Sequence, residues 1–304
     1  MSINRRQFIA NTALAGMAVT SPFFTRQALA GDKPLFRISL AQWSLNKSFF
    51  GGTLDPVEFA AISARTFGIE AIEYVNQFYA DTLNDALVKE LRRRADDEGV
   101  VSNLIMIDRE GALGNPDKKA RQTAVENHYK WADAAHVLGC RSIRVNAQSE
   151  GSWDEQMKLA ADGLHSLAEY CKKLGLYVLV ENHGGLSSNA QWLAGVMEMA
   201  DHDGVGTLPD FGNFVIDRET GESYDPYKGT AELMPYAKAV SAKTRDFDED
   251  GNEATIDYLR MMTIVKEAGY TDWVGIEYEG KNLPEETGIR KTKALLERIR
   301  DQLA

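Results

Sequence analysis

The chain has 304 residues, with 34 basic and 45 acidic side chains that give a formal net charge of −11 at pH 7. An acidic balance argues against nucleic acid as a partner, because phosphate backbones select basic protein faces. Two cysteines are too few for a disulfide scaffold. They leave open either one disulfide between Cys140 and Cys171 or two reduced, buried thiols.

The first thirty residues are typical of an export signal. RRQF at 5–8 precedes a mildly apolar stretch, and ALA at 28–30 forms a small-residue cleavage site. The arginine pair resembles a twin-arginine signal, which directs folded proteins across the membrane. The apolar stretch is too short and too rich in Ala and Thr to span a bilayer. We therefore expect the mature protein, residues 31–304, to reach the periplasm folded and without a membrane anchor.

After residue 30, a short β-rich run followed by a longer segment of helical period recurs eight times. The expected strands cover 36–45, 68–78, 100–108, 140–148, 176–182, 205–213, 239–247 and 273–280. The expected helices include 55–67, 83–99, 117–139, 154–175 and 255–269, each ending at or just before a glycine. Alternating strands and helices indicate parallel strands with crossover helices. Eight such units predict a single-domain α/β fold, the (β/α)8 TIM barrel, over residues 31–304.

The active site of such a barrel forms at the carboxyl ends of its strands. Glu181, Asp210 and Glu277 each close an otherwise apolar strand there. Three carboxylates at one barrel mouth would repel each other unless a cation lies among them. Oxygen ligands suit Mg²⁺ or Mn²⁺, and an added imidazole would also admit Zn²⁺ or Co²⁺. We therefore expect these residues to bind a divalent metal, whose identity stays open.

Three motifs at these strand ends resemble the xylose isomerase-like TIM-barrel family: VENHGG at 180–185, LPDFGNF at 208–214 and GIEYEG at 275–280. Members of that family include sugar phosphate isomerases and epimerases, ketose 3-epimerases, hydroxypyruvate isomerase, inosose dehydratase and type IV apurinic endonucleases. The resemblance covers essentially the whole mature chain. It implies that Glu181, Asp210 and Glu277 are three of four metal ligands. It also implies that the two glutamates are an acid/base pair, as in the ketose epimerases.

Two positions depart from the family pattern. Ser241 stands where the family usually has a strand-7 histidine, and Asn213 replaces the histidine of the Asp-x-x-His motif. His183, two residues past Glu181, could supply the missing nitrogen ligand or could bind substrate instead. The fourth metal ligand therefore stays open between His183, Ser241 and no protein group. The lost imidazoles and the acidic charge argue against the endonuclease activity.

Other polar strand-end residues are further candidates. Glu73 is expected either to take part in catalysis or to form an ion pair with Arg144 or Lys243. Lys243 or Arg144 is expected to stabilise a developing negative charge. Trp43 is either a wall of a sugar pocket or part of the core. The expected catalytic residues are Glu181, Glu277, Lys243 and Glu73, and the expected substrate-binding residues are Trp43, Arg144, His183 and Asn213.

These features predict a metal-dependent isomerase or epimerase that removes the proton α to the carbonyl of a sugar or keto-sugar, through an enediolate. The expected export and the lack of a glycine-rich phosphate loop at strands 7 and 8 favour an unphosphorylated sugar, glycoside or 3-keto-sugar. One alternative is a lyase or hydratase acting on a 3-keto-sugar or glycoside at the same site. Another is a sugar-binding barrel without catalysis. The sequence leaves open whether the protein forms a homo-oligomer.

Overall fold

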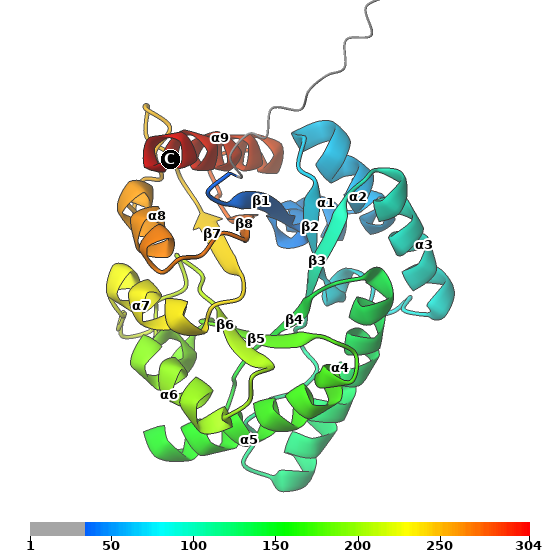
Figure 1. The fold of residues 1–304 in the computed structure, drawn as a ribbon, viewed down its shortest axis with the longest axis vertical. Helices are drawn as coiled ribbons and strands as arrows, with labels where there is room; N and C mark the ends of the chain where they lie inside the picture. Colours follow the sequence, from blue (N-terminus) through cyan, green and yellow to red (C-terminus); the bar gives the residue numbers. More distant parts are fainter. Residues whose placement is uncertain (1–33) are drawn as a thin grey trace, which may run out of the picture. The chain divides into compact units, whose positions relative to one another are not determined.

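Eight parallel strands form one curled sheet in the order β6-β5-β4-β3-β2-β1-β8-β7, with helices around its outer face (Figure 1). The computed structural model describes residues 34–304, so the signal expected at 1–30 lies outside the described residues. The strands are β1 Arg37–Ala41, β2 Ala71–Val75, β3 Val101–Met106, β4 Ser142–Val145, β5 Tyr177–Glu181, β6 Val205–Leu208, β7 Val240–Thr244 and β8 Trp273–Tyr278. Each lies inside an expected strand, and the predicted TIM barrel is confirmed.

The helices follow the strands in the expected alternation. They are α1 Asn46–Phe50, α2 Phe59–Ile62, α3 Asp85–Asp97, α4 Lys118–Leu138, α5 Trp153–Lys172, α6 Ala190–Ala200, α7 Pro226–Leu233, α8 Tyr258–Glu267 and α9 Glu285–Leu303. The glycines expected at helix ends all have positive φ angles, between 61° and 78°, at Gly68, Gly99, Gly139, Gly175 and Gly269. This left-handed conformation reverses the chain toward the next strand with little steric cost in glycine.

The barrel closes between β6 and β7 through isolated bridges instead of a continuous ladder. Thr207 pairs with Ala237, and Asp210 pairs with Ser241. Between the two bridges lies Pro209, which has no N–H to donate and so interrupts β6. Its carbonyl still accepts a hydrogen bond from the Ser241 N–H at 2.9 Å. The interruption leaves Asp210 just beyond the strand, beside Ser241 at the barrel mouth.

Side chains pack on both faces of the sheet. A large core lies between the strands and the helices, and a separate cluster fills the barrel interior. The interior cluster contains Ala41, Val75, Leu104, Met106, Leu179, Leu208 and Ala239. Neighbours such as Leu104 and Ile105 belong to different clusters because successive side chains of a strand point to opposite faces. The interior cluster supports the polar groups at the carboxyl ends of the strands.

Cys140 and Cys171 are both buried free thiols. The two cysteines are therefore reduced, which is one of the two states left open by the sequence, and the expectation of a disulfide between them is wrong. Within residues 34–304, no helix is both long and apolar enough to cross a membrane.

Candidate active site

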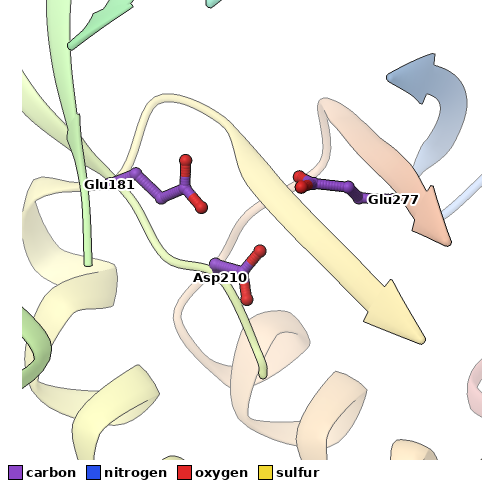
Figure 2. Close-up of side chains that lie close together, drawn as sticks. All are labelled: Glu181, Asp210 and Glu277. Carbon is purple, nitrogen blue, oxygen red and sulfur yellow. The ribbon is translucent and has the colours of Figure 1, made fainter. Parts of the chain in front are cut away.

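Glu181, Asp210 and Glu277 converge at the mouth of the barrel, as Figure 2 shows. Glu181 ends β5, Asp210 follows β6 and Glu277 lies in β8. One oxygen from each carboxylate lies within 4.8 Å of the others, and all three residues are buried. Burial of three carboxylates is costly unless positive charge is close by. The side chains that surround them show how this cost is offset.

Arg144 on β4 is the first of two buried cations beside the cluster. Its Nε donates a hydrogen bond to Glu181 Oε2, its Nη2 forms an ion pair with the same oxygen, and its Nη1 donates to Asp108 Oδ1 at 2.8 Å. Burial opposes ionisation of Glu181, but Arg144 and Lys243 outweigh it and lower the pKa of Glu181. Burial likewise opposes ionisation of Asp108, and Arg144 overcomes it to lower the pKa of Asp108 to about 2. Both carboxylates are therefore charged at neutral pH.

Lys243 on β7 is the second buried cation. Its Nζ lies 3.4 Å from Asp210 Oδ2, 3.1 Å from Glu277 Oε1 and 3.2 Å from Glu279 Oε2. Burial lowers the pKa of Lys243, but these carboxylates more than compensate and raise it above its ordinary value. The ammonium group therefore stays protonated. Lys243 was predicted as a site residue from the sequence, but its contacts with three acids were not.

Ser241 links two of the carboxylates. Its Oγ lies 2.8 Å from Asp210 Oδ2 and 3.1 Å from Glu277 Oε2. A hydroxyl carries a single proton, so it can donate to only one carboxylate at a time. Burial raises the pKa of Glu277 to about 8 and that of Asp210 to about 6, with Lys243 opposing both shifts. A protonated Glu277 can donate to Ser241 while Ser241 donates to Asp210, which satisfies all three groups.

Glu73 is placed differently from the expectation. It lies on β2, where its Oε1 accepts hydrogen bonds from Ser39 Oγ at 2.7 Å and Asn103 Nδ2 at 3.1 Å. The expected ion pair with Arg144 or Lys243 is therefore wrong. Neutral partners on β1 and β3 satisfy Glu73 inside the barrel, while both cations face the other acids. Glu73 lines neither of the two cavities described below.

Replacing Glu73 tests this burial through the pH dependence of stability. Burial raises the pKa of Glu73 from 4.5 to about 7, against the two hydrogen bonds. The folded chain thus keeps a proton that the unfolded chain loses, so Glu73 makes the free energy of unfolding fall as the pH rises through this window. The amide of Glu73→Gln does not titrate. The free energy of unfolding of this variant, measured relative to wild type, should therefore be about 3 kcal/mol higher at pH 8 than at about pH 4.5. Urea unfolding at both pH values measures this, and a difference that does not change with pH would contradict it.

Two adjoining cavities open above the carboxylates. The smaller has a volume of about 360 Å³ and is lined by Asp108, Arg144, Asn146 and Glu277 among others. The larger has a volume of about 550 Å³ and extends over the loops that follow β6, β7 and β8. Trp43, His183 and Glu279 line both cavities, so the two are neighbouring parts of one site. Both volumes are in the range of small-molecule sites.

The expected substrate-binding residues surround these cavities. Trp43 follows β1, and its Nε1 donates to Glu279 Oε1 at 2.6 Å, which fixes the indole plane at the cavity wall. Asn213 donates to Glu181 Oε1 at 2.8 Å and lines the larger cavity. The His183 ring lines both cavities, and burial lowers its pKa, so the imidazole is neutral near pH 7. Among the described residues, His183 does not join the converging carboxylates.

Two acceptor atoms in the smaller cavity were missed by the sequence analysis. Gln77 and Asn146 both donate their amide N–H groups to Asp108, at 3.2 Å and 2.7 Å. Asp108 accepts hydrogen bonds only, so it fixes the orientation of both amides. Their carbonyl oxygens are buried without a partner among the described residues. Asn146 directly follows β4, at a strand end where polar residues can belong to the site, whereas Gln77 lies in the turn after β2.

Comparison with known proteins identifies the class of this barrel. The profile of the family described as xylose isomerase-like TIM barrel matches residues 62–299. This match spans well over half of the chain, and the chain therefore belongs to that family. No curated protein sequence matches the chain.

Several solved structures share the fold. A xylose isomerase-like TIM barrel protein from Mycobacterium smegmatis, in complex with magnesium, has 17% identity and a TM-score of 0.66, with 88% of this chain and 98% of that chain covered. D-psicose 3-epimerase from Clostridium cellulolyticum has 13% identity and a TM-score of 0.67, covering 88% and 99%. The 3-keto-D-glucoside 4-epimerase of E. coli has 14% identity and a TM-score of 0.65, covering 80% and 94%. At these identities the likeness establishes the fold.

Proposed function

We propose that this protein is an isomerase or epimerase of a sugar or keto-sugar that transfers the proton α to a carbonyl. One observation carries the proposal: Glu277 lines the smaller cavity with Lys243 Nζ 3.1 Å from its carboxylate and Arg144 in the same cavity wall. A carboxyl group next to fixed cations can move a proton while the cations stabilise the negative charge that develops. The sugar epimerases among the similar structures support the same chemistry.

The lining of the smaller cavity suits a polyhydroxylated substrate. The unpartnered carbonyl oxygens of Gln77 and Asn146 can accept hydrogen bonds from sugar hydroxyls. Trp43 offers an aromatic face to the apolar side of a sugar ring. An apolar ligand would leave both acceptors unsatisfied, which costs free energy.

The residues present fit a divalent cation. The three carboxylates supply only oxygen ligands, and Ser241 Oγ lies beside two of them. Such a donor set suits Mg²⁺ or Mn²⁺ better than Zn²⁺ or Co²⁺, since no imidazole among the described residues joins it. We propose that Glu181, Asp210 and Glu277 hold this cation. When bound, it would polarise the carbonyl and the neighbouring hydroxyl of the substrate.

Each step of the proposed reaction is carried out by particular residues of the chain. In its ionised form Glu277, the member of the trio that lines the smaller cavity, removes the proton from the carbon next to the carbonyl, and the electron pair moves onto the carbonyl oxygen. Arg144 and Lys243 stabilise the resulting enediolate. Return of the proton to the neighbouring carbon gives isomerisation. Delivery of a proton to the opposite face of the same carbon gives epimerisation.

Solvent exchange tests the proposed function directly. The purified protein is incubated in D₂O with D-psicose, D-fructose or a 3-keto-glucoside, together with Mn²⁺ or Mg²⁺, and deuterium at the carbons next to the carbonyl is followed by NMR. Incorporation above the rate without protein supports the proposal. A β-elimination product would show the lyase instead. Binding without any exchange or elimination would favour the sugar-binding barrel.

We also propose that the chain is exported through its N-terminal twin-arginine-like segment. The support is the RRQF sequence at 5–8 and the small-residue site at 28–30. Fractionation of cells that express the full-length chain tests this. Accumulation of an uncleaved chain in the cytoplasm would contradict it.

A further inference from the structure

Four cations from separate segments of the chain line the larger cavity. Lys47 lies in α1 after β1, Arg218 follows β6, Arg245 follows β7 and Lys281 follows β8. The chain as a whole carries an excess of acidic residues, so this concentration of positive charge is unusual for its surface. Two acids, Glu279 and Glu285, line the same cavity.

Those two acids neutralise the cations only in part. Glu279 lies 3.2 Å from Lys243 Nζ, accepts a hydrogen bond from Trp43 Nε1 and forms a long ion pair with Arg245, at 3.9 Å. Glu285 accepts hydrogen bonds from the backbone N–H groups of Lys47 and Ser48, at 2.7 Å and 3.2 Å, in the segment after β1. Both carboxylates are therefore engaged by neighbouring protein groups.

Arg218 and Lys281 have no partner at all within the described part of the chain. Neither makes an ion pair or a side-chain hydrogen bond with another of residues 34–304. Among residues 34–304, the Lys47 ammonium donates only to the Gly280 carbonyl, at 2.8 Å, and this carbonyl carries no net charge. Cationic side chains that line a cavity without carboxylate partners attract anions, and an arginine fork matches a carboxylate or phosphate group.

We propose that the larger cavity binds an anionic group, a carboxylate or a phosphate, on a substrate whose reacting sugar lies in the smaller cavity. This inference rests on the proposed function. The two cavities share Trp43, His183 and Glu279, so one molecule can occupy both. Arg218 and Lys281 contact the anionic group, and the substrates of this protein are acidic sugars or sugar conjugates.

Calorimetric titration with three probes tests the charge requirement. D-Glucose is the neutral probe, D-glucuronate carries a carboxylate and D-glucose 6-phosphate carries a phosphate. The wild-type protein should bind at least one anionic probe about 10-fold more tightly than glucose, with an advantage that shrinks as salt increases. The tighter of the two anionic probes identifies the group. Equal or absent binding of all three probes would overturn the proposal.

A pair of matched double variants assigns the effect to this cavity. Arg218→Gln/Lys281→Gln should reduce the affinity for the preferred anionic probe about 10-fold, to the level that the same variant shows for glucose. Lys172→Gln/Lys173→Gln makes the same change in net charge at exposed positions at the end of α5, far along the chain from the cavity loops. It should keep the anion preference. Preserved preference in the first variant would overturn the proposal.

The titrations separate this inference from the proposed function. They measure binding without turnover, whereas the deuterium experiment measures proton transfer. For this comparison the exchange is also followed with the anionic keto-sugars D-fructuronate and D-fructose 6-phosphate. Anion preference without exchange on the neutral or the anionic keto-sugars would leave the subsite in place and contradict the isomerase. Exchange without anion preference would support the isomerase and contradict the anion subsite.

Discussion

Glu277→Gln is expected to slow deuterium incorporation into a keto-sugar by at least about 100-fold, because an amide cannot accept the substrate proton. The two side chains have nearly the same shape, so the variant side chain can still contact Ser241 and Lys243. The fold should therefore be preserved, and circular dichroism and urea unfolding check this. The exchange rate is measured by NMR at saturating substrate and metal.

The control for this prediction is Glu267→Gln, an exposed glutamate at the end of α8. That position precedes β8 and lies toward the end of the barrel opposite the strand carboxyl ends. The control variant should exchange deuterium at the wild-type rate. Full exchange by Glu277→Gln would show that another group moves the proton.

Arg144→Met is expected to lower the free energy of unfolding by about 3–5 kcal/mol at neutral pH, because it leaves buried carboxylates without their cation. Arg144 is 4% exposed and pairs with both Glu181, which is fully buried, and Asp108. Burial would then raise the pKa of Glu181, which its present partners keep low. Urea unfolding of the metal-free protein measures the loss.

The matched control is Arg93→Met on the surface of α3. Arg93 also pairs with two carboxylates, Glu90 and Asp97, but its side chain is 57% exposed. Water screens exposed ion pairs, so this variant should lose far less stability than Arg144→Met. Similar losses in the two variants would show that Arg144 contributes no more than a surface pair.

The positions of strands and helices could be predicted because their signals are local. Apolar runs and helical periods placed all eight strands, and glycines marked the helix ends. The convergence of Glu181, Asp210 and Glu277 also followed from sequence, since parallel strands bring their carboxyl ends to one face. Knowing the fold was therefore enough to group these residues.

The partners of the buried charges could not be predicted, because they depend on register and side-chain direction. A register shift between Ile72 and Glu73 adjusts the pairing of β2 with β3, and Glu73 bonds to Asn103 instead of to a cation. The interruption at Pro209 decides that Asp210 lies beside Ser241. Arg218 and Lys281 are in loops without a periodic pattern, so only the structure brings them to one cavity.

The most direct test of the account is the binding of Mn²⁺ to the purified protein, measured by equilibrium dialysis. Asp210→Asn preserves the side-chain shape but removes a charge from the cluster, and Asp203→Asn makes the same change at an exposed position before β6. We expect about one bound Mn²⁺ per chain for the wild type and for Asp203→Asn, and a large loss of affinity for Asp210→Asn. A wild-type protein that takes up no Mn²⁺ or Mg²⁺, or an Asp210→Asn variant that binds as well as wild type, would contradict it.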